Sequence, residues 1–318
     1  MMKTATTTSC GREPLVDSIV RFLARERVAN AREIRECVGQ AIDACGPGAI
    51  DALSARLLAA GTDWEYYPPD PLARRIHHAL APRVMRPEPV VKGCEHLEGL
   101  QGRPLVIFAN HLSYSDANVV EVLLRNAGAG WLADRLTAVA GPKVYSNVTR
   151  RFSSLCFGTI KVPQSSERSS EDAVMNPRDV ARAARHAIRI AHERLSLGEA
   201  LLIFGEGSRS RTARMQQVLP GTARYLELPG TVVLPIGITG TEKLFPIDGA
   251  ALHPVPITMN IGRPIPASDL RARAPRDRRM MMDSVGRAIA ALLPPDYRGV
   301  YQNQPTNLTD ALNLPSSL

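Results

Sequence analysis

The spacing of apolar residues changes along this chain, and the change falls near residue 86. Up to about Leu58, apolar side chains recur every three or four positions, which predicts amphipathic helices. Asn30 is placed to cap one of these helices, and the sequence Gly46-Pro47-Gly48 to end it. A further basic amphipathic helix is predicted from Leu72 to Val84. Together these patterns indicate a small N-terminal helical domain over residues 1–86.

From residue 87 onward, short runs of valine, isoleucine and leucine alternate with longer helical patterns. The predicted strands are Val90–Lys92, Pro104–Ala109, Leu136–Ala140, Thr159–Val162, Ala200–Phe204, Thr231–Thr239 and Ile257–Ile261. The predicted helices are Asp116–Arg125, Pro177–Leu197, Gly221–Leu228 and Asp277–Leu293, and polar Ser165–Met175 is expected to be a loop. Such alternation predicts an α/β fold with a mostly parallel central sheet flanked by helices. Residues 87–318 should form this domain, with functional residues beyond the carboxyl ends of its strands.

The composition narrows the class of protein. Apolar residues make up 44% and charged residues 22%, which is enough for a full core. The net charge of +8 favours an anionic partner such as a phosphorylated substrate or anionic lipid, or else marks a solvated basic surface. Basic residues recur throughout, and no zinc-finger, homeodomain or RNA-recognition signature is present, so we expect no nucleic acid partner.

The cysteines and the lengths of the apolar runs indicate in which part of the cell the protein is expected. The five cysteines are scattered and include no C-x-x-C pair, which favours a reducing cytosol over a disulfide scaffold or a zinc site. No run approaches the roughly 20 apolar residues that a spanning helix needs, and residues 1–14 have no apolar core of a signal peptide. We therefore expect a cytoplasmic protein, either soluble or attached peripherally to a membrane.

The first candidate site is the segment Asn110-His111-Leu112-Ser113-Tyr114-Ser115-Asp116, which follows a predicted strand. A histidine acts as a general base near neutral pH when its tautomer and orientation are fixed. Asp116, across a tight loop, is able to accept the Nδ1–H bond of His111 and leave Nε2 free to take a proton from a hydroxyl. The same pair is also expected if His111 only caps the helix that follows.

A second candidate is Phe204-Gly205-Glu206-Gly207-Ser208-Arg209-Ser210-Arg211, again directly after a predicted strand. Its glycines permit a tight turn with exposed backbone N–H groups, and its arginines are donors that suit a phosphate. The alternative is a simple strand-to-loop turn with surface arginines. Between the two motifs, Lys143 follows a strand and is placed to add a cation to the same pocket, whereas Arg150 and Arg151 fit a helix surface equally well.

A third segment, Leu234-Pro235-Ile236-Gly237, lies within a predicted strand. In this order, on an α/β pattern, the three segments resemble the glycerolipid acyltransferase family, which includes 1-acylglycerol-3-phosphate and glycerol-3-phosphate O-acyltransferases. The resemblance covers about residues 88–300, and the late sequence Leu293-Pro294-Pro295-Asp296-Tyr297-Arg298-Gly299 looks like the C-terminal ending of that family.

The resemblance implies an activity and roles for the site residues. His111 would deprotonate the acceptor hydroxyl, which attacks the thioester of acyl-CoA or acyl carrier protein, and Asp116 would support it. Glu206, Gly207 and Arg209, with Ser208 between them, would bind the acceptor phosphate, and Lys143 matches a basic position of the family. The acceptor would be a lysophospholipid or glycerol phosphate at the inner face of the membrane. No metal or organic cofactor is implied.

Two departures from the family pattern keep alternatives open. The family usually has proline where this chain has Gly205, and often has an arginine where this chain has Pro163-Gln164. The second departure leaves open a lyso-lipid acceptor without the standard glycerol phosphate. An acyltransferase for a non-glycerolipid acceptor and a non-catalytic lipid-binding protein of the same fold both stay open. A hydrolase is less favoured, because no Gly-x-Ser-x-Gly nucleophile motif is present.

Overall fold

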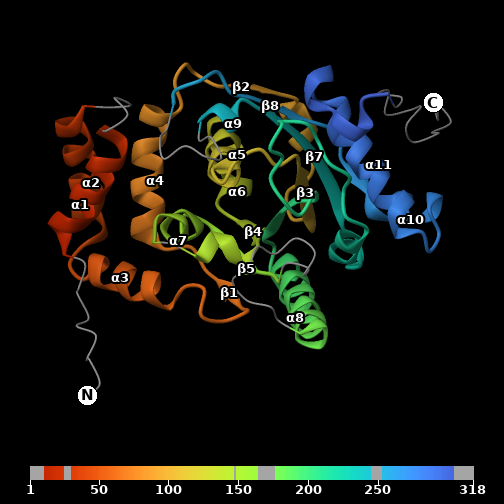
Figure 1. Cartoon of the computed structure of the whole chain (residues 1–318), viewed down its shortest axis with the longest axis horizontal. Helices are drawn as coiled ribbons and strands as arrows, with labels where there is room; N and C mark the ends of the chain where they lie inside the picture. The colour runs from red at the N-terminus through yellow and green to blue at the C-terminus, as the bar shows by residue number, and fades with distance from the viewer. Residues whose placement is uncertain (1–10, 25–29, 147, 164–175, 245–252, 304–318) are drawn as a thin grey trace.

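The structure is a computed structural model, and it describes residues 11–24, 30–146, 148–163, 176–244 and 253–303. Within these residues a nine-stranded sheet forms the centre of the molecule (Figure 1). Its strands are β1 (Tyr66–Tyr67), β2 (Val90–Lys92), β3 (Leu105–Ala109), β4 (Leu136–Ala140), β5 (Gly158–Lys161), β6 (Ala200–Phe204), β7 (Val232–Thr239), β8 (Thr258–Ile261) and β9 (Ile265–Pro266).

The helices surround this sheet and connect its strands. The α-helices are α1 (Arg12–Ala24), α2 (Ala31–Cys45), α3 (Ala49–Ala59), α4 (Pro71–Val84), α5 (Asp116–Asn126), α6 (Gly130–Ala133), α7 (Val148–Ser154), α8 (Pro177–Ser196), α9 (Thr241–Leu244), α10 (Ala267–Arg273) and α11 (Arg278–Ala291). The 3-10 helices used below are η1 (Cys94–Leu97), η2 (Pro142–Tyr145), η4 (Pro220–Leu226), η5 (Pro295–Tyr297) and η6 (Gly299–Tyr301).

The strand order confirms the expected mostly parallel sheet. The order is β1-β5-β4-β6-β3-β7-β8-β2, with β9 beside β7. The central neighbours β5, β4, β6, β3 and β7 are all parallel, whereas β1, β8 and β9 join the sheet through antiparallel pairs. Parallel strands need helical crossovers that cover both faces, which explains why β3 is buried along its whole length.

Alternate residues of β3 enter two separate apolar clusters, as the two-residue period of a strand requires. Leu105, Ile107 and Ala109 pack in a cluster with residues of α1 to α5. Val106 and Phe108 pack in a second cluster with residues of α8, α10 and α11. The fold thus has three layers, with α1, α2 and α4 on one side of the sheet and α10 and α11 on the other (Figure 1).

The N-terminal helices begin and end where their sequence signals predict. Asn30 caps α2 through a hydrogen bond from the Arg32 N–H, and Gly46 at φ 80° follows its last residue. The division of the chain at residue 86 stays a prediction. Two features tie this segment to the rest: β1 pairs with β5, and the apolar residues of α1 to α4 share one cluster with β3 and β7.

One predicted element differs in type from the structure, two short strands were not predicted, and one predicted loop falls outside the described residues. Residues Gly221–Leu228 were expected to form an α-helix, but Pro220–Leu226 forms the 3-10 helix η4, which begins at a proline followed by a glycine. Strands β1 and β9 were not predicted, because two residues are too few to show an alternating pattern. The predicted loop Ser165–Met175 lies outside the described residues.

Candidate active site

The two motifs that the sequence singled out meet at one edge of the sheet. Strands β3 and β6 are parallel neighbours, and their last residues, Ala109 and Phe204, are partners in register. His111 and Glu206 each follow two residues later, so both lie beyond the carboxyl ends of the strands. The backbone N–H of His111 donates to Glu206 Oε1 at 2.8 Å, and the Ser210 N–H donates to the His111 carbonyl at 2.8 Å. The loops after β3 and β6 are therefore bound to each other.

His111 and Asp116 form a hydrogen-bonded pair. The distance from His111 Nδ1 to Asp116 Oδ2 is 2.9 Å, and the His111 ring stacks on Phe204 with ring centres 4.3 Å apart. Within the described part of the chain, Nε2 of His111 has no hydrogen-bond partner, and the side chain is 16% exposed. The carboxylate fixes the ring with Nδ1 as donor, and Nε2 is left to accept a proton.

Asp116 also shapes the loop that carries His111. It is the first residue of α5 and is fully buried, and its Oδ2 accepts the N–H groups of Leu112 at 2.7 Å and Ser113 at 2.9 Å. A carboxylate in the first turn of a helix is favoured by the helix dipole, and this one also accepts two N–H groups of the preceding loop. The same oxygen atom thus stabilises the loop conformation and orients the imidazole of His111.

Asn110 fastens the same loop to β7. Its Nδ2 donates to the Ile238 carbonyl at 2.9 Å, and its Oδ1 accepts the Ile238 N–H at 2.8 Å. The side chain is fully buried, so both of its polar ends are satisfied inside the protein. The predicted segment around Leu234–Gly237 is accordingly core, and its contribution to the site is to hold the end of β3.

Glu206 is a buried carboxyl between two backbone donors. Besides His111, the N–H of Gln216 donates to its Oε2 at 2.7 Å. Burial raises the pKa of Glu206 to about 7, against the opposing effect of hydrogen bonds from Gln216 and His111. Glu206 therefore connects the His111 loop to the segment around residue 216.

Arg209 lies against an aromatic residue of the first motif. Its guanidinium carbon is 3.5 Å from the centre of the Tyr114 ring, and the guanidinium carbon of Arg150 is 4.1 Å from the same centre. Both guanidinium groups therefore contact the same aromatic ring. Burial lowers the pKa of Arg209, and the charge of Arg150 acts in the same direction. Arg209 Nη1 is buried without a hydrogen-bond partner among the described residues.

The remaining predicted site residues are Gly207, Ser208 and Lys143. Gly207 makes the turn after β6 at φ 72°, and Ser208 beside it is half-buried. Lys143 is exposed in η2, and among the described residues no contact joins its side chain to His111 or Arg209. Its backbone carbonyl instead accepts from Arg150 Nη1 at 3.2 Å. The cation that the structure brings to Arg209 is thus Arg150, which the sequence pattern left as a possible surface residue.

The position where the family usually has proline is tightly filled. A Cβ atom at Gly205 would lie 2.7 Å from Val218 Cγ1 and 3.3 Å from the Phe108 ring. Because protein interiors are close-packed, a larger residue here would have to displace Val218. In this chain Val218 occupies the space that a side chain at position 205 would need, which is consistent with glycine there.

One cluster outside this site has side chains that bind metals in other proteins. Nε2 atoms of His77 and His78 lie 3.2 Å and 2.9 Å from the carboxylate of buried Glu121. Arg74 and Arg125 lie 3.4 Å and 3.1 Å from the same carboxylate. Although burial favours its protonated form, the hydrogen bonds from the histidines hold the pKa of Glu121 below its ordinary value. Two guanidinium groups already supply the positive charge that a metal ion would bring, so these residues do not fit a metal site.

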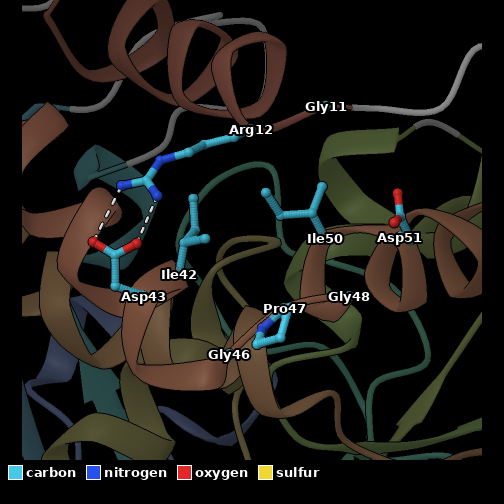
Figure 2. A pocket seen from close by; sticks show the side chains of 9 residues that line it. All are labelled: Gly11, Arg12, Ile42, Asp43, Gly46, Pro47, Gly48, Ile50 and Asp51. Atoms are coloured by element: carbon cyan, nitrogen blue, oxygen red, sulfur yellow. Dashed lines mark hydrogen bonds and ion pairs between the residues drawn. The ribbon is translucent and has the colours of Figure 1, made fainter.

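A hollow of about 450 Å³ lies between α1, α2 and α3, far along the chain from the motifs. Figure 2 shows that Arg12 and Asp43 form a bidentate pair at its wall, with Ile42, Pro47 and Ile50 nearby. None of its lining residues takes part in the contacts around His111. His111, Asp116 and Arg209 lie beyond the strand ends and not at this hollow.

Comparison with known proteins identifies the domain that carries this site. Residues 88–239 match the Acyltransferase family. The chain is also similar to the crystal structure of the 1-acyl-sn-glycerophosphate (LPA) acyltransferase PlsC from Thermotoga maritima, with 18% identity, a TM-score of 0.46 and coverage of 87% of this chain and 95% of that one. No curated protein matches the chain in sequence. The chain therefore contains, at residues 88–239, a domain that matches the Acyltransferase family.

Proposed function

We propose that this acyltransferase moves a fatty acyl group from acyl-CoA or acyl carrier protein to a hydroxyl of a lysophospholipid or glycerol phosphate, with His111 as the general base. The observation that carries the proposal is the 2.9 Å bond between His111 Nδ1 and Asp116 Oδ2 inside the family-matched domain. It leaves Nε2 as the basic atom, on a side chain that is partly accessible.

The proposed reaction is one transfer without a covalent enzyme intermediate. His111 Nε2 takes the proton of the acceptor hydroxyl as its oxygen attacks the thioester carbonyl, and a new C–O bond forms. The tetrahedral intermediate collapses, the C–S bond breaks, and the leaving thiolate receives the proton from the His111 imidazolium. Asp116 stabilises that imidazolium, because its carboxylate is buried and directly hydrogen-bonded to Nδ1.

Arg209 and Arg150 support an acceptor that carries a phosphate. Both guanidinium groups contact Tyr114, which lies three residues after His111 in the same loop. The two guanidinium groups repel each other, and the buried Nη1 of Arg209 has lost its contact with water without gaining a partner among the described residues. A bound phosphate would offset the repulsion and would accept a hydrogen bond from Nη1. We propose that Arg150 takes the part that the resemblance suggested for Lys143.

Replacing Arg209 with alanine should raise the KM for lysophosphatidic acid by roughly 10- to 100-fold, the value of one or two charged hydrogen bonds. The KM for acyl-CoA should stay near that of the wild type, since the guanidinium is assigned to the acceptor. Arg211→Ala is the matched control, because Arg211 lies two residues on and is exposed. An equal loss with monoacylglycerol, which has no phosphate, would contradict the assignment.

The competing functions differ in what releases the thiol. A transferase frees the thiol of palmitoyl-CoA only when an acceptor is added, a hydrolase frees it with water alone, and a lipid-binding protein frees none. Lysophosphatidic acid, glycerol 3-phosphate and monoacylglycerol are the acceptors to compare. Release only with an acceptor that lacks phosphate would favour a non-glycerolipid or neutral acceptor over the one proposed here.

Contact with a membrane is proposed to rest on charge. In the described residues no helix is long and apolar enough to cross a membrane. The apolar side of α4, a candidate for membrane contact, is buried in the core through Leu72 and Ile76, and its Arg83 pairs with Glu33 at 2.9 Å. The net charge of +8 supports attraction to the anionic inner face of the membrane.

Co-sedimentation with vesicles tests this contact. The protein should bind vesicles that contain phosphatidylserine or phosphatidylglycerol at low salt, and should be released as salt screens the attraction between charges. Vesicles of phosphatidylcholine alone are the control and should bind much less protein. Binding that ignores both salt and lipid charge would show that charge does not hold the protein at the membrane.

A further inference from the structure

The C-terminal segment Pro295–Tyr301 lies against residues 215–218, which follow the second motif. The Met215 N–H donates to the Tyr297 carbonyl at 2.8 Å, and the Val300 N–H donates to the Met215 carbonyl at 3.2 Å. The Val218 N–H donates to the hydroxyl oxygen of Tyr301 at 3.1 Å. Backbone and side-chain groups of the C-terminal segment thus hold both ends of residues 215–218.

Tyr301 is fixed tightly in this position. It is 2% exposed, and its hydroxyl lies 3.3 Å from Asp283 Oδ1 of α11, which also accepts from Gln217 Nε2 at 3.2 Å. A Cβ atom at Gly286 would lie 2.3 Å from the Tyr301 ring, so that glycine makes room for the aromatic side chain. A buried hydroxyl with both a donor and an acceptor in place has little freedom to move.

Gly299 explains why the segment approaches so closely. Its φ of 53° is in the left-handed region, and a Cβ atom there would lie 2.0 Å from the Met215 carbonyl oxygen. Glycine is the residue that tolerates both the backbone conformation and the contact. The ending that looked like the C-terminus of the family therefore has a defined place in this fold, directly against the segment that follows Arg209.

Residues 215–218 connect this C-terminal segment to the catalytic loop. Gln216, between the two held ends, donates its N–H to Glu206 Oε2 at 2.7 Å, and Glu206 Oε1 accepts the His111 N–H at 2.8 Å. Val218 contacts the Gly205 position just before Glu206. A continuous path of hydrogen bonds and close packing therefore runs from Tyr301 through Val218, Gln216 and Glu206 to His111.

We propose that Tyr301 is a positioning residue for acyl transfer: by holding the Val218 N–H, it keeps the Gln216 N–H on Glu206 and so keeps the His111 loop in place. The inference rests on the proposed function of His111. Tyr301 itself lies in the second apolar cluster with residues of α11. Its effect on His111 is indirect and passes through Val218, Gln216 and Glu206. The ionised form of Glu206 is the one that accepts both N–H groups best.

The variant Tyr301→Phe tests the proposal. It keeps the ring and removes the acceptor of the Val218 N–H. We expect kcat to fall by roughly two- to tenfold, the rate equivalent of one neutral hydrogen bond, with both KM values unchanged. A weaker Gln216 bond disfavours the Glu206 carboxylate and raises its pKa, so the acid limb of kcat/KM should move to higher pH.

Tyr297→Phe is the matched control. It removes a hydroxyl that donates to Glu242 at 2.6 Å but keeps the backbone carbonyl that accepts from Met215. It should lower the unfolding temperature without moving the pH profile. A Tyr301→Phe enzyme with the kcat and pH profile of the wild type would overturn the proposal, as would equal shifts in both variants.

A titration without turnover separates this proposal from the proposed function. The carboxyl carbon of Glu206 is followed by ¹³C NMR and assigned with Glu206→Gln. Its pKa should be higher in Tyr301→Phe than in the wild type and in Tyr297→Phe. If wild-type protein transfers no acyl group, the proposed function fails, and this titration still reports whether Tyr301 acts on Glu206. An unchanged Glu206 pKa in Tyr301→Phe would reject the positioning role.

Discussion

Replacing His111 with alanine is expected to lower kcat by about two to four orders of magnitude, because acyl transfer then lacks its proposed general base. The fold should be kept, since the loop contacts of His111 use its backbone: the N–H donates to Glu206 and the carbonyl accepts from Ser210. The variant loses only the ring stacked on Phe204 and the bond to Asp116. Steady-state thiol release with saturating lysophosphatidic acid and palmitoyl-CoA measures the effect.

His96→Ala is the control for a histidine lost elsewhere. His96 is half-buried in η1, and its Nδ1 contacts the Ile261 carbonyl at 2.9 Å, outside the site. Its variant should keep the kcat of the wild type at a temperature below the unfolding transition. If His111→Ala retained near wild-type kcat, or if both variants lost activity equally, His111 would not be the base.

The second large effect is expected at Asp116, where two substitutions should differ. Alanine removes the oxygen that accepts from His111, Leu112 and Ser113, so both the ring and the loop lose their anchor. We expect Asp116→Ala to lower kcat by about 100- to 1000-fold, most of the contribution of the base itself. The unfolding temperature should also fall, because two buried N–H groups are left without partners.

Asparagine at the same position should be much less harmful. All three donors meet Oδ2, whereas Oδ1 is buried without a hydrogen-bond partner among the described residues. An amide oxygen in the place of Oδ2 would accept the same three bonds and keep the His111 tautomer. The charge that stabilises the imidazolium would be lost, and the amide NH2 would be buried in the place of Oδ1, where the described residues offer no partner. The expected loss in kcat is roughly tenfold. A loss as deep as that of Asp116→Ala would show that charge, not anchoring, is the main role.

The central strands and the His111 motif could be predicted because their signals are local. Strands β4 and β6 have the predicted bounds, since buried parallel strands appear as continuous apolar runs between turn residues. The edge strand β2 also has its predicted bounds, although its residues are exposed or half-buried. The pairing of His111 with Asp116 also depends on one short loop. The general rule for the carboxyl ends of parallel strands was enough to expect His111 near the Glu206 turn.

The cations and the supporting contacts could not be predicted in the same way. Lys143 and Arg150 are seven residues apart, and which of them meets Arg209 depends on how η2 and α7 are turned, which periodicity does not specify. Tyr114 has no role in the predicted site, yet both guanidinium groups contact its ring. The reach of Tyr301 to Val218 spans 83 positions, and only the packed structure brings them together.

The central claim is tested most directly by analysing the products of the wild-type protein with palmitoyl-CoA and lysophosphatidic acid. Free thiol is measured and the lipid product is identified by mass spectrometry, with water alone as the reference reaction. The account predicts equal amounts of thiol and of a diacylated phosphate lipid, and almost no thiol without the acceptor. Thiol release with free palmitate as the product, with or without acceptor, would mean that water is the acceptor and would contradict acyl transfer to a phosphate-bearing hydroxyl.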